Sequence, residues 1–470
     1  MIYAKAPRMP FKAASRAGGW CAGLGFLATM SVLGLWLFGT APELRRELIL
    51  LCLGCVLICV VVIALQQRSS GGRRSFREIA TAVCTQTAEE VHGSARELIS
   101  LPRVLPSRRG QQLRSLAWGI GITTVLVGIS ALALGTPQRS ELVEHIHSAG
   151  AEFGVARAEK VSDVRRKSSR GKDPYTATVV VQLPVKAGGE PVSVTVKATT
   201  NKLLHPGDPV EVLYAPAQPR LGAVAGDEYS LGWQVRGETM PAYMRWFFIA
   251  AWVLGCFVTV TWVSAKHGSR SYAHLGERDK SIRGRYTRVA GPGVQAGQES
   301  SGKAVYLEVR TDAGWVHFYT DLGKRGLPEV MVGEKLWLCW DAHRGVRASR
   351  ISPSRTPAVL VFDTGLVVHG MMSVAQARSL NDSGVSVEKM APAQSEYQSL
   401  RLFDFRSSWP LVIDSLILQI CVVVIACAAL LTFDVATGWR SAAGIIGFLG
   451  AISASGVYLS EGTSKKSSTV

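Results

Sequence analysis

The stretch that decides the fold is residues 48–65, which read LILLCLGCVLICVVVIAL without a charged side chain. A helix needs roughly 17–25 apolar residues to cross the hydrocarbon core of a bilayer. Buried helices of soluble proteins are usually shorter and carry a polar stripe. The stretch therefore predicts a membrane-spanning helix. Five further blocks of the same kind occupy residues 20–38, 116–134, 247–263, 411–433 and 442–459.

These blocks predict an α-helical polytopic membrane protein with about six transmembrane helices and two small all-β modules, each a barrel or sandwich. The first block has a basic head but exceeds the usual signal-peptide core of about 7–15 residues, so we expect an uncleaved anchor. The expected order is a tail (1–19), helices 1 and 2 (20–65), a loop with an amphipathic helix (66–114), helix 3 (116–134), a β-domain (136–245), helix 4 (247–263), a second β-domain (266–371), a polar linker (372–409), helices 5 and 6 (411–459) and a tail (460–470).

The distribution of basic residues predicts the orientation. Lys and Arg number 24 in one set of alternate windows: 1–19, 66–114, 266–288, 401–409 and 460–470. The other set, 40–47, 135–150, 230–245 and 434–440, holds only 6. Cytoplasmic loops carry the excess of Lys and Arg in membrane proteins, so both termini and the second β-domain are expected in the cytoplasm. This topology also accounts for most of the net charge of +17.

Alternating apolar residues predict strands in both β-domains. In the outer one, Ala177, Val179, Val181 and Leu183 fall on one side of a strand, and two further strands follow at 192–196 and 210–214. In the cytoplasmic one, strands are expected at 305–309, 315–320, 336–340, 359–362 and 366–368. Short strands separated by turn signals favour a small barrel or sandwich.

One segment occurs in similar form in both β-domains. Residues 207–214 read GDPVEVLY and residues 333–340 read GEKLWLCW. Both give a glycine, an acid, and then aliphatic residues alternating toward an aromatic. The pattern is typical of a turn glycine that leads into a half-buried strand. Two explanations of the likeness stay open: the modules are related by duplication, or each follows the residue pattern common to turns and strands.

The outer domain also resembles a family of bacterial membrane proteins, one of the numbered domains of unknown function, which place a small β-barrel between transmembrane helices. The likeness lies in residues 158–166 (AEKVSDVRR), 175–179 (YTATV) and 205–216 (HPGDPVEVLYAP), followed by Pro219 and Arg220. It covers roughly one hundred residues. The resemblance implies the fold and a bacterial plasma membrane, and it implies no activity, because the family has no catalytic residues to carry over.

Few residues suggest chemistry. Glu141, Glu144, His145 and His147 form the one metal-like group. On a helix Glu141 and His145 would share a face, whereas on a strand the two histidines would. Because a site needs three or four converging ligands, we expect a solvated polar collar and no bound metal. No nucleophile elbow, Walker loop or dinucleotide fingerprint is present, so neither catalysis nor a cofactor is predicted.

The predicted spans contain polar and small residues that bear on transport and packing. Asp414 and Gln419 lie in the first half of 411–433, and Asp414 is read as a helix-end acid, so a transporter is disfavoured. Cysteines 52, 55 and 59 are read as packing residues. A ridge of small residues in the last span predicts close contact with another helix of this or another chain. It consists of Ala443, Gly447, Ala451 and Ser455, and Gly19 and Gly23 could act similarly in the first span.

Two functions remain open. The leading expectation is a non-enzymatic accessory or scaffold protein of the cell envelope that binds partners through its β-modules. The alternative is a ligand sensor or regulator in which the outer module acts on the cytoplasmic one through a single helix, 247–263. Expected partners are the lipid bilayer and a protein or a second copy. No nucleic acid is expected, because the 20 basic residues of 266–409 are offset by 14 acidic ones and its aromatic residues suit a barrel core.

Overall fold

The computed structural model describes residues 11–69, 101–166, 175–185, 190–200, 202–267, 272–290, 306–320, 331–343, 355–389, 400–403 and 413–460. Of the loop expected at 66–114 with its amphipathic helix, residues 70–100 lie outside these described residues, as do residues 461–470 of the tail expected at 460–470.

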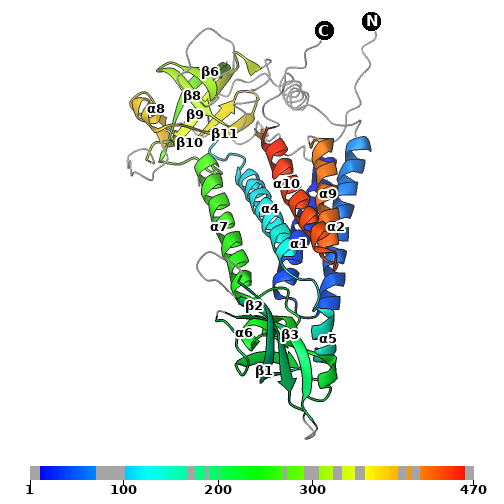
Figure 1. The fold of residues 1–470 in the computed structure, drawn as a ribbon. Coiled ribbons are helices and arrows are strands. Elements are labelled where there is room, and N and C mark those ends of the chain that lie inside the picture. Colours follow the sequence, from blue (N-terminus) through cyan, green and yellow to red (C-terminus); the bar gives the residue numbers. More distant parts are fainter. Residues whose placement is uncertain are drawn as a thin grey trace, which may run out of the picture.

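The helical part is built from long apolar helices (Figure 1). They are α1 (Phe11–Phe38), α2 (Pro42–Ser69), α4 (Arg109–Leu134), α7 (Ala242–His267), α9 (Ser415–Leu431) and α10 (Thr437–Ser460). Among the described residues, five of these are long and apolar enough to cross a membrane, and α9, with 17 residues, is shorter. The protein is therefore a helical membrane protein, and the block expected at 411–433 forms a shorter helix. Its start is fixed by Asp414, whose carboxylate accepts a hydrogen bond from the Leu416 amide (3.0 Å).

The first β-domain follows α4. It contains α5 (Glu141–Ser148), β1 (Glu152–Arg166), β2 (Tyr175–Leu183), β3 (Val192–Thr200), β4 (Pro209–Tyr214), η1 (Pro219–Leu221), β5 (Ala223–Ala225) and α6 (Glu228–Val235). The antiparallel strands lie in the order β3-β2-β1-β4-β5 and curl into a nearly closed barrel. Val179, Val181 and Leu183 are fully buried in its core, which confirms the alternation expected for that strand.

The second β-domain follows α7. It contains β6 (Asp279–Ala290), β7 (Tyr306–Thr311), β8 (Gly314–Tyr319), β9 (Lys335–Asp341), β10 (Arg355–Phe362), β11 (Leu366–Ser373), α8 (Val374–Ser379), β12 (Val385–Ser386), η3 (Val387–Lys389) and β13 (Arg401–Leu402). Six strands close a barrel, because β6 pairs with β7 and β9, β8 with β11, and β10 with both β9 and β11. The expected strands are present. The expectation lacked β6, whose four basic residues were counted as juxtamembrane charge.

The prediction that residues 372–409 form a polar linker was wrong for the part that the structure describes. These residues hold the end of β11, α8, β12, η3 and β13. Ala377, Leu380 and Phe403 are buried in the barrel core. These three apolar residues thus anchor the stretch to the barrel, while Ala375 and Val385 lie at its surface.

The two barrels share one topology. The strand order β8-β7-β6-β9-β10 of the second repeats β3-β2-β1-β4-β5 of the first. The glycines of the two similar segments, Gly207 and Gly333, both adopt positive φ angles (+95° and +88°), which L side chains rarely adopt. Gly207 donates its amide hydrogen to the Ala158 carbonyl (2.7 Å) and Gly333 to the Tyr286 carbonyl (2.8 Å). A one-residue register shift follows Ala158 in β1 and Tyr286 in β6.

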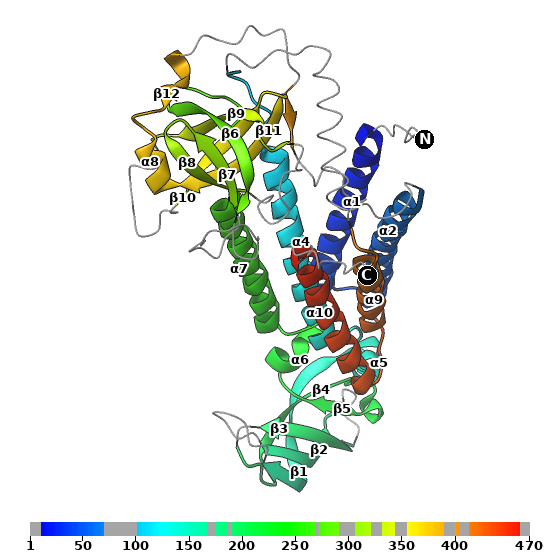
Figure 2. The same ribbon diagram turned by 90° about the horizontal axis from the view of Figure 1, so that it is seen from above.

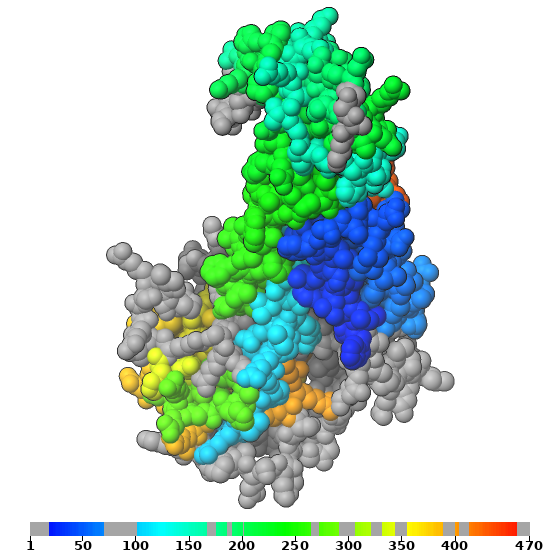
Figure 3. Space-filling model, turned by 90° about the horizontal axis from the view of Figure 1, so that it is seen from below, coloured from blue at the N-terminus to red at the C-terminus, as the bar shows by residue number. Residues whose placement is uncertain are grey.

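The β-domains lie at opposite ends of the helical part (Figures 1 and 2). In the space-filling view the first β-domain projects as a separate lobe (Figure 3). Two copies of one barrel topology therefore flank a set of apolar helices, and any communication between them passes through those helices.

Candidate functional site

Two helices connect the β-domains. α4 begins directly after residues 101–108, which pack on the second β-domain, and ends before α5 of the first. α7 begins after α6 of the first β-domain and ends before β6 of the second. The two helices lie side by side over their length (Figures 1 and 2). Along the chain α7 alone leads from the first β-domain to the second, as expected. α4 is an additional link that the sequence did not indicate, because residues 101–108 before it pack on the second β-domain.

α4 and α7 contact each other through two reciprocal pairs of a glycine and a threonine. A Cβ atom built on Gly119 of α4 would lie 2.3 Å from the Cγ2 atom of Thr259 of α7. One turn along, a Cβ atom built on Gly255 of α7 would lie 2.4 Å from Cγ2 of Thr123 of α4. Each threonine stands four residues from the glycine of its own helix, the spacing at which small residues let two membrane helices approach closely. The backbones therefore meet at two points.

The threonines in this interface have their hydroxyl groups satisfied. Thr123 Oγ1 donates to the Gly119 carbonyl (3.0 Å), and Thr259 Oγ1 donates to the Gly255 carbonyl (2.9 Å). The adjacent Thr124 accepts a hydrogen bond from the indole Nε1 of Trp252 on α7 (3.0 Å). A polar group without a partner is costly in an apolar environment. The bonds within each helix remove that cost, and the Trp252 bond joins α7 to α4.

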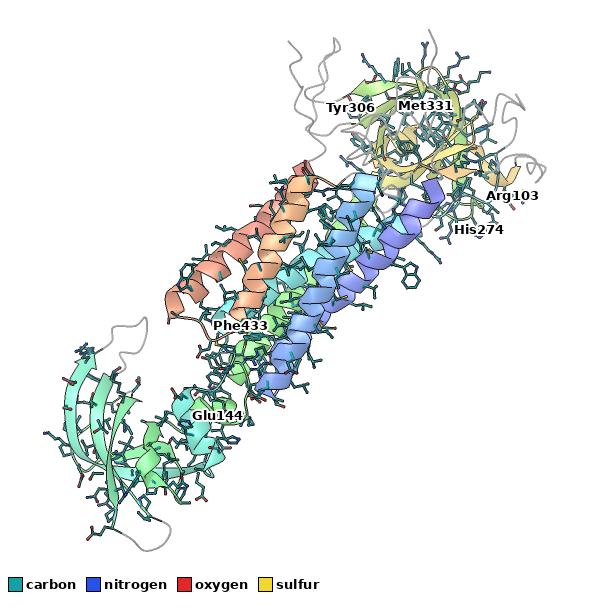
Figure 4. The ribbon with its side chains drawn as sticks, turned by 90° about the vertical axis from the view of Figure 1, so that its right-hand side faces the viewer. Arg103, Glu144, His274, Tyr306, Met331 and Phe433 are labelled. Atoms are coloured by element: carbon teal, nitrogen blue, oxygen red, sulfur yellow. The ribbon has the colours of Figure 1, made fainter. Side chains whose placement is uncertain are left out.

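We call the helix pair α4 and α7 the connector. The start of α4 is attached to the second β-domain by the segment 101–108. The Leu105 amide donates to the Ala273 carbonyl (3.0 Å), and the Leu275 amide donates to the Arg103 carbonyl (2.9 Å). Leu101 and Leu105 are buried against the outer surface of β9 and β10. Figure 4 shows Arg103 and His274, the residue between Ala273 and Leu275, on the same side of this domain. The start of α4 therefore moves with the barrel.

His369 of β11 completes this attachment. Its imidazole Nε2–H donates to the Pro106 carbonyl (2.8 Å), and only 6% of the residue is exposed. The pKa of His369 is lowered to about 4, chiefly by burial; the bond to Pro106 raises it in part, and the nearby Arg108 guanidinium makes a smaller contribution that lowers it. At neutral pH the ring is therefore uncharged, with its proton on the nitrogen that bonds Pro106. A second buried bond, from Tyr272 Oη to the Pro357 carbonyl (2.6 Å), lies beside it.

The other end of the connector is attached to the first β-domain by arginines that bind backbone carbonyls. Arg139, between α4 and α5, donates to the carbonyls of Gln234 (3.1 Å) and Val235 (3.0 Å) at the end of α6. It also forms an ion pair with Glu144 (2.9 Å). The Thr136 amide donates to the carbonyl of Thr239 (2.8 Å), just before α7. The starts of α5 and α7 are thus held together.

Arg45 extends this attachment to the first two helices. It is buried, and it donates to the carbonyls of Gly39 (2.8 Å), Gly237 (2.8 Å) and Pro137. Its guanidinium lies 5.5 Å from the ring centre of Trp36. One side chain therefore joins the α1–α2, α4–α5 and α6–α7 connections.

Arg440 at the start of α10 acts similarly on the end of α4. It donates to the carbonyls of Ala133 (3.2 Å), Leu132 and Gly135. The last carbonyls of a helix have no partner within it and carry partial negative charge, so a guanidinium stabilises them.

The six basic residues of the sparsely charged windows all have partners in the structure. Arg45, Arg139 and Arg440 bind carbonyls, as described above. Arg236 and Arg245 pair with Glu238 (3.2 and 3.1 Å), and Arg46 lies 5.8 Å from the Phe433 ring centre. These contacts give a physical reason why the six are retained in windows that otherwise contain few Lys and Arg residues.

The residues singled out as a weak metal candidate lie on α5. Glu141, His145 and His147 are all exposed on this helix, where Glu141 and His145 are four residues apart. Glu144 pairs with Arg139. Among the described residues, no group of three or more His, Cys, Asp or Glu is placed so that it could hold a metal ion.

The predicted small-residue ridge of α10 packs within this chain. Ala443 and Ala451 are buried, and a Cβ atom on Gly447 would lie 3.2 Å from Cys427 of α9 and 3.4 Å from Ile129 of α4. Ser455 donates to the Ala451 carbonyl (2.8 Å). The ridge therefore faces α4 and α9.

Sequence reasoning overlooked the connector residues, although a signal for some of them is present. Gly119 and Thr123, like Gly255 and Thr259, are pairs of small residues four apart, the same pattern that was noticed in α10. His369 carries no such signal, because it is one polar residue within an apolar strand whose partner, Pro106, lies 263 positions earlier.

Comparisons with protein-family models, with curated proteins and with solved structures found no match, so the geometry described above is the basis for a functional proposal, and the resemblance of the first β-domain to a bacterial family stays an expectation.

Proposed function

We propose that this protein is a non-enzymatic membrane regulator in which a change in the first β-domain is passed to the second through α4 and α7. The observation that carries the proposal is the attachment of this helix pair to a β-domain at each end. Arg139 and Thr136 hold it at the first, and Leu105 and His369 hold it at the second. A protein that only displays two binding modules has no need for a connector fixed at both ends, so this geometry favours the sensor over the accessory scaffold.

The Gly–Thr contacts supply the mechanism. Two helices whose backbones meet at Gly119 and Gly255 do not slide by small amounts, because each threonine methyl group fills the space above a glycine. A ligand or partner that binds one arrangement of the first β-domain more tightly shifts the population toward it. The helix pair then moves as a unit, and the start of α4, which residues 101–108 attach to β9, β10 and β11, moves the second β-domain with it.

Hydrogen–deuterium exchange of the full-length protein in nanodiscs tests this role. Arg139→Gln loosens the attachment at the first β-domain. The expected result is faster amide exchange, by about threefold or more, in peptides covering 101–108 and β11 at the opposite end of the molecule. Arg157→Gln, which removes an exposed charge from β1, is the matched control and leaves those peptides unchanged. If both variants alter exchange only in the first β-domain, the two domains are not coupled and the proposal fails.

The proposal includes the orientation of the chain: six spans, both termini and the second β-domain in the cytoplasm, and the first β-domain outside the plasma membrane. The distribution of Lys and Arg supports it. A protease-cleavable tag inserted after Gly188 should be cut in intact cells, and a tag after Val470 only after lysis. The reverse pattern would overturn the orientation.

A further inference from the structure

The second β-domain carries a row of basic side chains across three neighbouring strands. Lys335 on β9 is directly opposite Arg285 on β6, and Arg285 is directly opposite Arg310 on β7. On the next strand, β8, Trp315 is directly opposite Arg310. Directly opposite residues on antiparallel strands have Cβ atoms about 4.5–5.5 Å apart. The three cations and the indole therefore form one continuous row, which we call the cationic row.

The cationic row lies on the outer surface of the barrel. Arg285 and Arg310 are exposed, and 53% of Trp315 is exposed. The residues next to them in sequence point inward, since Tyr286, Val309 and Val316 are buried in the barrel core. The guanidinium of Arg310 lies 5.9 Å from the ring centre of Trp315. A flat aromatic surface and positive charge are thus presented together.

Two neighbouring acids of the described residues pair with arginines outside this row. Arg283 is paired with Asp363 (2.5 Å) and Arg288 with Glu308 (2.7 Å), so two further arginines on β6 are neutralised locally. Two acids, Glu334 before β9 and Asp312 in the β7–β8 turn, border the row at its two sides. Like charges directly opposite each other on neighbouring strands destabilise a sheet, and an anion that bridges the row removes that penalty.

The first β-domain shows that the fold itself does not require such a row. Ala158 occupies the position of Tyr286, because each accepts the bond from the turn glycine of its own domain. Arg157 of β1 therefore corresponds to Arg285, and the partner of Arg157 on β4 is Pro209. On the neighbouring strands the pair Gln182 and Ser193 takes the place of Arg310 and Trp315. Both of these side chains donate hydrogen bonds to Glu159 (3.1 Å from Ser193). One cation and a satisfied polar cluster thus replace three cations and an indole.

We propose that the cationic row binds single-stranded nucleic acid, with Arg285 and Arg310 on successive phosphates and Trp315 stacked on a base. Guanidinium groups match phosphate oxygens in a forked geometry. Exposed aromatic rings beside such cations are the means by which proteins hold unpaired bases without reading their sequence. The anionic surface of a membrane would use the cations but has no base to stack on Trp315. This inference is independent of the coupling role proposed above.

Fluorescence anisotropy of the full-length protein in nanodiscs of zwitterionic lipid tests the inference, with a labelled 12-nucleotide oligo(U) and oligo(dT) as probes. The wild type is expected to bind both at low salt. R285Q/R310Q should weaken binding by about tenfold or more and reduce the slope of log K against log salt by about 1.4, the value for two lost phosphate contacts. Trp315→Ala should weaken binding by about 5- to 100-fold, as expected for one lost stacking contact.

Two controls make these effects specific. R378Q/R401Q removes two exposed arginines elsewhere on the same domain and should change affinity little. Thermal unfolding of every variant establishes that it is folded. Absence of oligonucleotide binding by the wild type, or equal loss in the control double variant, would overturn the inference. The inference would also be overturned if R285Q/R310Q impaired binding to vesicles of anionic lipid while its affinity for the oligonucleotides stayed unchanged.

Discussion

Gly119 of α4 and Thr259 of α7 touch so closely that a single added methyl group on the glycine would lie 2.3 Å from the threonine Cγ2 atom. The reciprocal contact of Gly255 with Thr123 is nearly identical, at 2.4 Å. This relationship distinguishes the α4–α7 pair from helices held together by loosely fitting apolar side chains. It makes the connector between the β-domains sensitive to changes of one carbon atom.

Gly119→Ala is therefore expected to destabilise the protein by about 1–3 kcal/mol, because the added methyl group must displace either Thr259 or a helix backbone. Thr259→Ser in the same chain removes the Cγ2 atom and should restore most of the loss. Thermal unfolding in detergent measures both. Gly54→Ala on α2, where nothing lies within 4 Å, is the control and should cost nothing. Equal effects of the two alanine substitutions would contradict the close contact.

The bond between His369 and Pro106 predicts a specific pH dependence. The folded protein holds the pKa of His369 at about 4, against 6.5 for an unperturbed histidine. As pH falls below 6.5 the unfolded chain binds a proton while the folded protein does not until about pH 4, so the free energy of unfolding decreases across that interval. The full shift corresponds to about 3 kcal/mol.

Unfolding curves at pH 7.5, 5.5 and 4.5 check this prediction. His369→Gln keeps a side-chain N–H for the Pro106 carbonyl but cannot be protonated, so its stability should vary less over this range than that of the wild type. His205→Gln, at an exposed position of the first β-domain, should retain the wild-type dependence. If the free energy of unfolding of His369→Gln changed with pH as steeply as that of the wild type, the buried imidazole would not be the source of the pH dependence.

Arg440→Gln should lower stability by about 2 kcal/mol, because hydrogen bonds from a charged donor to the carbonyls of Leu132, Ala133 and Gly135 are lost together. Arg46→Gln removes the same charge at the same end of the bundle. It loses only a contact with the Phe433 ring, and should cost less than half as much. The comparison of unfolding midpoints in one detergent decides between a role for the carbonyl bonds and a role for charge alone.

Cys339 reports on the attachment of residues 101–108. The thiol is fully buried on β9, and burial, with a smaller contribution from Asp279, raises its pKa well above the usual value. It should resist maleimide in the native protein. Leu105→Asp places a charge in the cluster that contains Cys339 and should expose the thiol. Peptide mapping by mass spectrometry separates Cys339 from the other eight cysteines. Unchanged labelling would show that the segment does not cover this face.

The sequence predicts the elements whose pattern is local. Uninterrupted apolar blocks indicate the long helices, and the strand at 175–183 follows from alternation alone. The turn glycines 207 and 333 mark the start of the same strand in both domains, as the structure finds. Each of these depends on a few neighbouring residues, which is why a single sequence suffices.

What the sequence does not predict depends on pairing between distant segments. β6 looks like a basic flank of a span until the register shows that Ile282, Gly284 and Tyr286 face the barrel interior. The cationic row exists only because Lys335, Arg285 and Arg310 come from three separate strands. The docking of residues 101–108 requires a domain that begins 164 positions later, at Tyr272.

The carbonyl partners of Arg45 also fix an order of events during biosynthesis. Pro137 and Gly237 lie 92 and 192 residues further along the chain. At a synthesis rate of about 5–20 residues per second, roughly 10–40 s pass before Gly237 is made. During that time the donors of Arg45, near the start of α2, that later bind the Gly237 carbonyl are satisfied by water and lipid headgroups. The N-terminal hairpin therefore enters the bilayer early but reaches its final position late, because nascent chains shorter than 237 residues lack the bond from Arg45 to the Gly237 carbonyl.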